Sequence, residues 1–223
     1  MKVKIERVLI SVSDKTGITD LARDLEKMGA EIISTGGTHR SIDRAGIKVR
    51  KVEEITGFPE MMEGRVKTLH PMVHGGILAD RKKDSHLKEM ASAGILPIDM
   101  VVVNLYPFKE TISASGAEPE DAVENIDIGG PTMIRSAAKN HDSVAVIVDP
   151  SDYGEISREM QENEGSLSAD TLYRLAAKAF QHASESDSEI FEYMHGWIDV
   201  QQDTKININP RITIGICIAR LNN

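Results

Sequence analysis

The chain has 223 residues, 40% of them hydrophobic and 27% charged, and its formal net charge is −9. This composition is typical of a globular protein, while the negative charge and the 4% of aromatic residues disfavour a nucleic-acid partner, because phosphates are repelled and bases find few rings to stack on. A single cysteine, Cys217, excludes an internal disulfide, and no apolar run approaches the roughly 18 residues of a membrane span, so a cytoplasmic protein without a membrane partner is expected.

A β-α-β unit is predicted at the start of the chain. The β-branched run at 7–13 predicts a buried strand, and apolar residues then recur at helical spacing over 18–28. A second strand is expected at 30–34. Because such crossovers are right-handed and join parallel strands, both strands should end at the same edge of a sheet.

The segment 35–38, Thr-Gly-Gly-Thr, follows this second strand and opens a helix predicted at 39–45. Ligands of parallel sheets bind where a strand ends and a helix begins, and the helix amides favour phosphate. Ser11, Ser13 and Lys15 would end the neighbouring strand at the same edge. A glycine-rich connection without a ligand is the alternative, but the hydroxyls, the ammonium and the bare amides favour a phosphate site.

A basic segment follows a short strand at 48–52 and a brief helix within 53–62. Residues 64–71 hold Arg65, Lys67 and His70, with apolar residues between them. A solvated loop is one interpretation, but the apolar, glycine-containing run at 72–78 predicts partial burial. His70 and His74 lie four apart with a proline between them and no HExxH pattern, so no metal is expected, and His70 should position the loop.

An exposed helix is predicted at 80–93, and a central strand is predicted at 98–106. Asn104 and Tyr106 are polar residues that end this apolar run, which favours a binding role at the sheet edge. A loop at 108–116 and an acidic helix at 118–126 should follow.

The stretch from Asp127 to His141 combines a carboxylate, two glycines and a helix that should open on Pro131. Side chains on a helix lean toward its N-terminus, so Lys139 could swing back toward Asp127 and form an acid/base pair. An ordinary loop and helix with surface charges is the alternative.

The rest of the chain predicts packing elements. A strand at 143–148, a helix at 150–162 and a long helix capped by Ser168 should complete a domain of residues 1–198, with a face for a dimer. Residues 199–223 form a tail, partly polar and partly apolar, to which no role is assigned.

Taken in order, the motifs resemble the IMP cyclohydrolase domain of the bifunctional AICAR transformylase/IMP cyclohydrolase, over about residues 6–197. The resembling segments are Ser11-Val-Ser-Asp-Lys-Thr-Gly17, Ser34-Thr-Gly-Gly-Thr38, Gly57-Phe-Pro-Glu60, Gly64-Arg-Val-Lys-Thr-Leu-His-Pro71, His74-Gly-Gly-Ile-Leu78, Asn104-Leu-Tyr-Pro-Phe108, Asp127-Ile-Gly-Gly-Pro131 and Ala137-Ala-Lys-Asn-His141.

The resemblance implies an α/β fold like that of methylglyoxal synthase, a three-layer arrangement with a mainly parallel sheet. It implies closure of 5-formamidoimidazole-4-carboxamide ribonucleotide to inosine 5′-monophosphate with loss of water, without metal, nucleotide cofactor or folate. From the dimer face of the long helix we expect a homodimer. Nothing like the opening motif of the family's second domain follows Trp197. We therefore expect cyclohydrolase without transformylase activity, and a separate formylating enzyme upstream.

The resemblance also implies site residues. Lys67 with Tyr106, and Asp127 with Lys139, would be catalytic pairs. Asp127 would handle the carboxamide proton, while Lys67 and Tyr106 would stabilise the formyl oxyanion; the sequence leaves the reverse assignment open. The 5′-phosphate would be held by Ser11, Ser13, Lys15, Thr35, Gly36, Gly37 and Thr38, and the base and ribose by Arg65, Thr68, Asn104, Ile128, Gly129 and Gly130.

Two other functions share this fold. A methylglyoxal-synthase-type lyase would use the Thr-Gly-Gly-Thr segment but has no use for Lys67, Tyr106, Asp127 and Lys139. A nucleotide-sensing regulatory domain would need no acid/base residues at all. The candidate catalytic residues therefore favour the cyclohydrolase.

Overall fold

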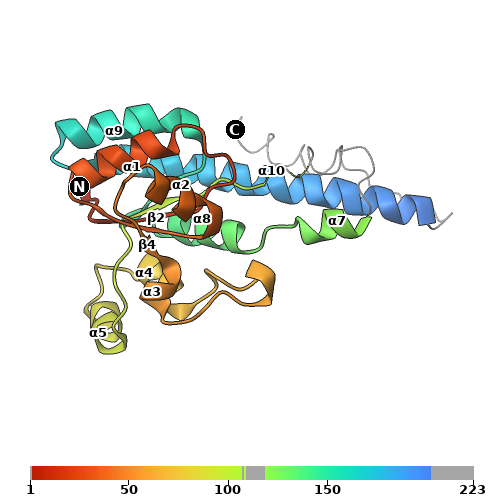
Figure 1. Cartoon of the computed structure of the whole chain (residues 1–223), viewed down its shortest axis with the longest axis horizontal. Helices are drawn as coiled ribbons and strands as arrows, with labels where there is room; N and C mark the ends of the chain where they lie inside the picture. The colour runs from red at the N-terminus through yellow and green to blue at the C-terminus, as the bar shows by residue number, and fades with distance from the viewer. Residues whose placement is uncertain (1, 107, 109–118, 202–223) are drawn as a thin grey trace, which may run out of the picture. The chain divides into compact units, whose positions relative to one another are not determined.

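The computed structural model describes residues 2–106, 108 and 119–201 (Figure 1). Its main sheet has five parallel strands in the order β4-β3-β2-β5-β6, which confirms the predicted α/β fold. Their bounds are β2 Arg7–Ile10, β3 Glu31–Ser34, β4 Arg50–Lys51, β5 Met100–Val102 and β6 Ala145–Ile147. A separate antiparallel pair joins β1 (Lys2–Lys4) to β7 (Ser166–Ser168).

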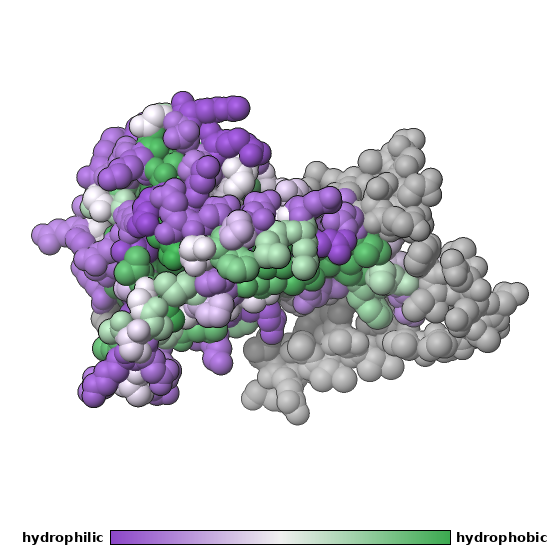
Figure 2. All heavy atoms as spheres, turned by 60° about the horizontal axis from the view of Figure 1, so that its bottom comes forward, coloured by the Kyte–Doolittle hydropathy of each residue, from purple (hydrophilic) through white to green (hydrophobic). Residues whose placement is uncertain are grey.

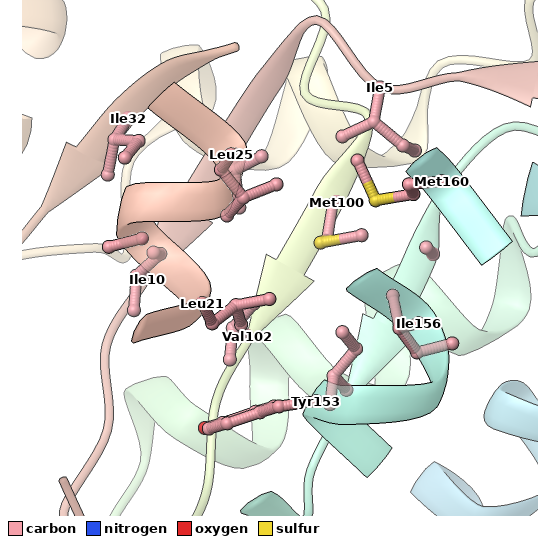
Figure 3. Packing of buried hydrophobic residues seen from close by; sticks show 14 of the residues in the cluster. Ile5, Ile10, Leu21, Leu25, Ile32, Met100, Val102, Tyr153, Ile156 and Met160 are labelled. Carbon is pink, nitrogen blue, oxygen red and sulfur yellow. The ribbon is translucent and has the colours of Figure 1, made fainter. Parts of the chain in front are cut away.

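Helices cover both faces of the main sheet, because alternate side chains of each strand point to opposite faces. One core contains Val8 and Ile10 of β2 and packs against α1 (Ile18–Lys27), α2 (Gly36–Arg44) and α9 (Tyr153–Glu162). Figure 3 shows Leu21 and Leu25 of α1 facing Ile156 and Met160 of α9 across Met100.

The other core contains Leu9 of β2 and Val101 of β5. It packs against α3 (Val52–Thr56), α4 (Pro71–Leu78), α8 (Gly129–Lys139) and part of α10 (Ala169–Gln201). The remaining elements are η1 (Met62–Gly64), α5 (Asp84–Ala93), α7 (Pro119–Glu124) and η2 (Pro150–Asp152).

The strands are shorter than the sequence predicts. The first ends at Ile10 rather than at residue 13, and the central one ends at Val102 rather than at residue 106. The cause lies in the polar residues that follow, since the backbone N–H groups of Ser13 and Asp14 donate to the Asn104 side chain, at 2.7 and 2.9 Å, instead of to a neighbouring strand. The residues lost from the strands thus form the edge at which a ligand can bind.

Helix α4 and the β1–β7 pair are absent from the sequence-based expectation. Glycines at 75 and 76 weaken the helical pattern, but they allow close packing, since a Cβ atom on Gly76 would lie 2.4 Å from the Leu96 carbonyl oxygen. The predicted cap is confirmed: Ser168 Oγ accepts a hydrogen bond from the Thr171 N–H at 3.3 Å.

Contacts divide the chain into two units, residues 1–187 and 188–223. The predicted loop at 108–116 and the tail from 202 lie largely outside the described residues. In the part of the chain that the structure describes, no helix has the length and apolar character to cross a membrane.

Candidate active site

A cavity of about 650 Å³ opens at the carboxyl edge of the main sheet. Its walls come from the segments after β2, β3 and β5, from the basic loop before α4, and from the segment that leads into α8. Every predicted site residue except Lys139 lines it: Ser11, Ser13, Lys15, Thr35, Gly36, Gly37, Thr38, Arg65, Lys67, Thr68, Asn104, Tyr106, Asp127, Ile128, Gly129 and Gly130.

One end of the cavity is the N-terminus of α2. The helix already begins at Gly36, so the Thr-Gly-Gly-Thr segment is its first turn rather than a loop before it. The first intrahelical bond runs from the His39 N–H to the Thr35 oxygen, 3.0 Å away, which leaves the amides before His39 to face a ligand. Lys15 lies beside this turn, 3.9 Å from where a Cβ of Gly37 would be. Amides, helix dipole and ammonium together suit a phosphate.

The hydroxyls contribute less than the sequence suggests. Thr38 Oγ1 donates to the Val12 carbonyl at 3.0 Å and accepts from the Val12 N–H at 3.1 Å, so its proton is not available to a phosphate oxygen. Ser11 Oγ and Thr35 Oγ1 share a hydrogen bond of 2.9 Å, which uses one of their two protons. The Thr38 side chain thus fastens α2 to the segment after β2, which leaves the backbone N–H of Thr38 as its group available to a ligand.

Asn104 is a structural part of the cavity wall. Its Oδ1 accepts the amides of Ser13 and Asp14, and its Nδ2 donates to the Asp14 oxygen at 2.9 Å. The side chain is buried, as a residue that holds a loop should be. Asn104 therefore shapes the 13–14 loop in addition to lining the cavity, and its predicted contact with a ligand stays a prediction.

The other end of the cavity is the N-terminus of α8. Asp127 Oδ1 accepts a hydrogen bond from the Gly130 N–H at 3.0 Å, so the carboxylate sits at the positive end of the helix. Gly130 is required there, because a Cβ would lie 2.3 Å from Asp127 Oδ2 and 2.6 Å from Leu105 Cδ2. Pro131 is the third helical residue rather than the first, since the glycines already belong to α8.

Lys139 is the last residue of α8 and is exposed. At 1.5 Å per residue, about 15 Å of helix separates it from Gly129, whereas an extended lysine side chain reaches about 6 Å. The expected swing of Lys139 toward Asp127 within one chain is therefore wrong. Helical lean moves a side chain by about one turn, not by the length of a helix.

The basic loop joins the two helix N-termini. Lys67 Nζ lies 3.3 Å from the Cβ position of Gly36 in α2, while Thr68 Oγ1 lies 2.9 Å from the Cβ position of Gly129 in α8. Two adjacent residues therefore reach both ends of the cavity. A ligand with a phosphate at α2 would place its other end beside Asp127.

Two carboxylates that sequence reasoning missed pair with the cations of this loop. Lys67 Nζ lies 2.7 Å from Glu60 Oε2, and Arg65 pairs with Glu124 of α7. The Arg65 guanidinium holds the pKa of the Glu124 carboxyl below its ordinary value, and Glu124 raises the pKa of Arg65. Glu60 lies in the Gly57-Phe-Pro-Glu60 motif and Glu124 in the predicted acidic helix. Only the folded chain shows which cation each carboxylate pairs with.

His70 positions the loop, as predicted. Its Nδ1 accepts from the Met72 N–H at 3.2 Å and so caps α4. Burial lowers the pKa of His74, whose Nδ1 lies 3.3 Å from Ser136 Oγ between α4 and α8. Among the described residues there is no group of three His, Cys, Asp or Glu that could hold a metal ion.

Comparisons with known proteins identify the family of the chain and agree with its fold. Residues 17–132 match the model of the MGS-like domain, and residues 137–215 match that of the AICARFT/IMPCHase bienzyme. The chain is 37% identical to the protein in the crystal structure of ForH, with a TM-score of 0.78 over 85% of this chain and 97% of that one.

Curated relatives are longer than this chain. The bifunctional purine biosynthesis protein PurH of Streptococcus mutans is 56% identical over 203 residues, which are 91% of this chain and 39% of the relative. PurH of Ruminiclostridium cellulolyticum is 55% identical over 190 residues, 85% of this chain and 37% of the relative. The chain thus spans about two fifths of the length of these relatives.

Proposed function

Because the chain belongs to the MGS-like domain family, we propose that it is an IMP cyclohydrolase, which closes 5-formamidoimidazole-4-carboxamide ribonucleotide to inosine 5′-monophosphate. The likeness to PurH and to the AICARFT/IMPCHase bienzyme model supports this activity in purine biosynthesis. One observation carries the proposal: a single cavity is lined by the first turn of α2, which suits a phosphate, and by Lys67 and Asp127.

The reaction joins two ends of one substrate. The carboxamide nitrogen attacks the formyl carbon, and Asp127 takes a proton from that nitrogen as the bond forms. Lys67, with Tyr106, stabilises the charge on the formyl oxygen and protonates it to a hydroxyl. The hydroxyl then leaves as water while the former formamide nitrogen gives up its proton, so atoms balance and no electrons are transferred.

The wall of the cavity supplies the physical requirements of this step. An amide is a weak nucleophile, so a base must act during attack, and charge on oxygen needs a donor that is already in place. Holding both reacting groups in one conformer supplies much of the rate in an intramolecular reaction. The phosphate at α2 fixes one end of the substrate and so orients the other.

Turnover of two substrates, together with nucleotide binding, distinguishes this function from the lyase and the regulatory domain. The protein should convert the formamido ribonucleotide to inosine monophosphate, followed by absorbance, and should form no methylglyoxal from dihydroxyacetone phosphate. Methylglyoxal formation would indicate the lyase. Nucleotide binding without turnover of either compound would indicate a regulatory domain.

Replacing Lys15 with alanine should weaken substrate binding. The ammonium lies beside the first turn of α2, so its loss is expected to raise KM about 10- to 100-fold while kcat falls less than about threefold. Initial rates over a range of substrate concentrations provide the measurement. An unchanged KM would contradict the placement of the phosphate at α2.

We further propose a cytoplasmic homodimer in which Lys139 acts on the cavity of the second copy. The length of α8 keeps Lys139 away from its own Asp127, and the residue is exposed. Large apolar side chains are also exposed on α10, including Tyr173 at 67% and Phe180 at 41%. Figure 2 shows a hydrophobic strip between hydrophilic areas on one face of the described residues, as an interface requires.

Subunit mixing tests the role of Lys139. Lys139→Ala alone should lower kcat about 10²-fold, the lower end of the range for loss of an acid/base group. Co-refolding it with an inactive Asp127→Asn chain should restore about a quarter of wild-type activity, because half of the dimers are mixed and each holds one intact site. Activity that never exceeds the average of the two variants would contradict sharing between copies.

A formyl-transfer reaction must supply the substrate. Since the described cavity is assigned to ring closure, the transfer of the formyl group needs a different active site, and we propose a separate formylating enzyme for it. The proposed partner for this cavity is therefore a small purine ribonucleotide, with neither nucleic acid nor membrane.

A further inference from the structure

The loop between α3 and α4 carries an ion pair inside the candidate active site. Lys67 Nζ lies 2.7 Å from Glu60 Oε2, and the Lys67 side chain is 20% exposed. A charge pair that is partly withdrawn from water is screened less than a surface pair. Glu60 therefore has a direct influence on where the Lys67 ammonium lies.

A strained turn brings the two residues together. Met62, Glu63 and Gly64 have φ angles of 53°, 56° and 97°, left-handed values that are uncommon for residues other than glycine. Backbone hydrogen bonds of 3.0 and 3.3 Å between Met61 and Val66 close the turn. Strained backbone persists where the surrounding structure holds it, and it gathers at functional sites.

The position of the Lys67 ammonium is electrostatically unfavourable without a counter-charge. It lies against Gly36 at the positive end of α2, and the Lys15 ammonium lies beside Gly37 in the same turn. Like charges repel, and a cation at a helix N-terminus is destabilised by the helix dipole. Glu60 supplies the negative charge that allows Lys67 to remain there.

A bound phosphate would change this balance. The 5′-phosphate at α2 attracts every ammonium within reach, and a Lys67 side chain drawn toward it would be lost to the formyl oxygen. A carboxylate that already pairs with Lys67 competes with the phosphate for the ammonium.

We propose that Glu60 is a positioning residue that reserves Lys67 for the reacting end of the substrate and keeps it from the phosphate. This inference rests on the proposed cyclohydrolase function. Glu60 touches no reacting atom; it acts through Lys67.

The test is a split between kcat and KM. Glu60→Ala should lower kcat about 10- to 100-fold, the cost of a misplaced catalytic group. KM should fall severalfold, because the freed ammonium binds the phosphate and a repelling charge has left the cavity. Glu60→Gln keeps an acceptor for Lys67, so kcat should recover to within about fivefold of wild type while KM stays low. If Glu60 served folding alone, its replacement by alanine would raise KM, and glutamine at position 60 would not restore kcat.

Glu89→Gln provides the matched control. Glu89 is an exposed carboxylate of α5 that does not line the cavity, so the kcat of this variant should equal that of wild type. Calorimetry with inosine monophosphate gives a readout independent of turnover, and Glu60→Ala should bind it more tightly than wild type does.

The outcomes separate this inference from the proposed function. Wild-type protein that makes no inosine monophosphate overturns the function. Active wild-type protein together with a Glu60→Ala variant of unchanged kcat, or with weaker binding of inosine monophosphate, overturns the positioning role alone.

Discussion

Asp127→Asn is expected to lower kcat about 10²- to 10⁴-fold, the range for loss of a general base. Asparagine has the same shape, and its Oδ1 can still accept the Gly130 N–H bond that now measures 3.0 Å, so the start of α8 should be preserved. What is lost is the basic oxygen that takes the carboxamide proton. Because the phosphate cradle lies at the other end of the cavity, KM should change less than about threefold.

Two further variants serve as controls for Asp127→Asn. Asp142→Asn removes an exposed carboxylate that pairs with Lys82 away from the cavity, and it should leave kcat unchanged. Gly130→Ala should resemble Asp127→Asn in its effect on kcat, since the added Cβ would displace the carboxylate it meets at 2.3 Å. An Asp127→Asn enzyme with more than a third of wild-type kcat would exclude Asp127 as the base.

Lys67→Met should lower kcat about 10²- to 10³-fold, as expected for removal of one donor to a developing oxyanion. Methionine keeps most of the aliphatic length of the side chain but lacks the Nζ atom that lies beside Gly36, so the charge is removed with little loss of volume. Single-turnover rates with saturating enzyme separate this chemical effect from substrate binding. Thermal unfolding should show little loss of stability, because the partner Glu60 is exposed enough to be hydrated.

Lys83→Met is the matched control for Lys67→Met. Lys83 is an exposed lysine before α5, outside the cavity, and its replacement should change neither kcat nor KM. If Lys67→Met instead raises KM with kcat intact, the ammonium serves the phosphate, and its assignment to the formyl oxygen is wrong.

The parallel sheet and its ligand-binding edge could be predicted from the sequence because local patterns determine them. The apolar runs that became β2 and β5 are followed by polar residues, and parallel strands bring such ends together. The predicted site residues of the two segments 11–15 and 35–38 therefore line the same cavity, as expected. Strand length could not be predicted, because it depends on Asn104 replacing a strand as the partner of the Ser13 and Asp14 amides.

The wrong prediction for Lys139 and the missed Glu60–Lys67 pair have a common physical cause: both depend on distances that only the folded chain determines. Lys139 shares a sequence stretch with Asp127, but Asp127 precedes the first turn of α8 and Lys139 ends its last, so the length of the helix separates them. Glu60 and Lys67 are seven residues apart, and only a turn with left-handed Met62 and Glu63 makes them neighbours. No propensity scale predicts two such residues in succession, since each is unfavourable alone.

The most direct test is stoichiometric turnover by the wild-type chain. Purified protein given the formamido ribonucleotide, with no other substrate, should produce one inosine monophosphate for each molecule consumed, measured by mass spectrometry as the loss of one water. An Asp127→Asn preparation purified in the same way excludes a contaminating enzyme. Folded wild-type protein that binds the ribonucleotide and returns it unchanged would contradict the assignment of this cavity to ring closure.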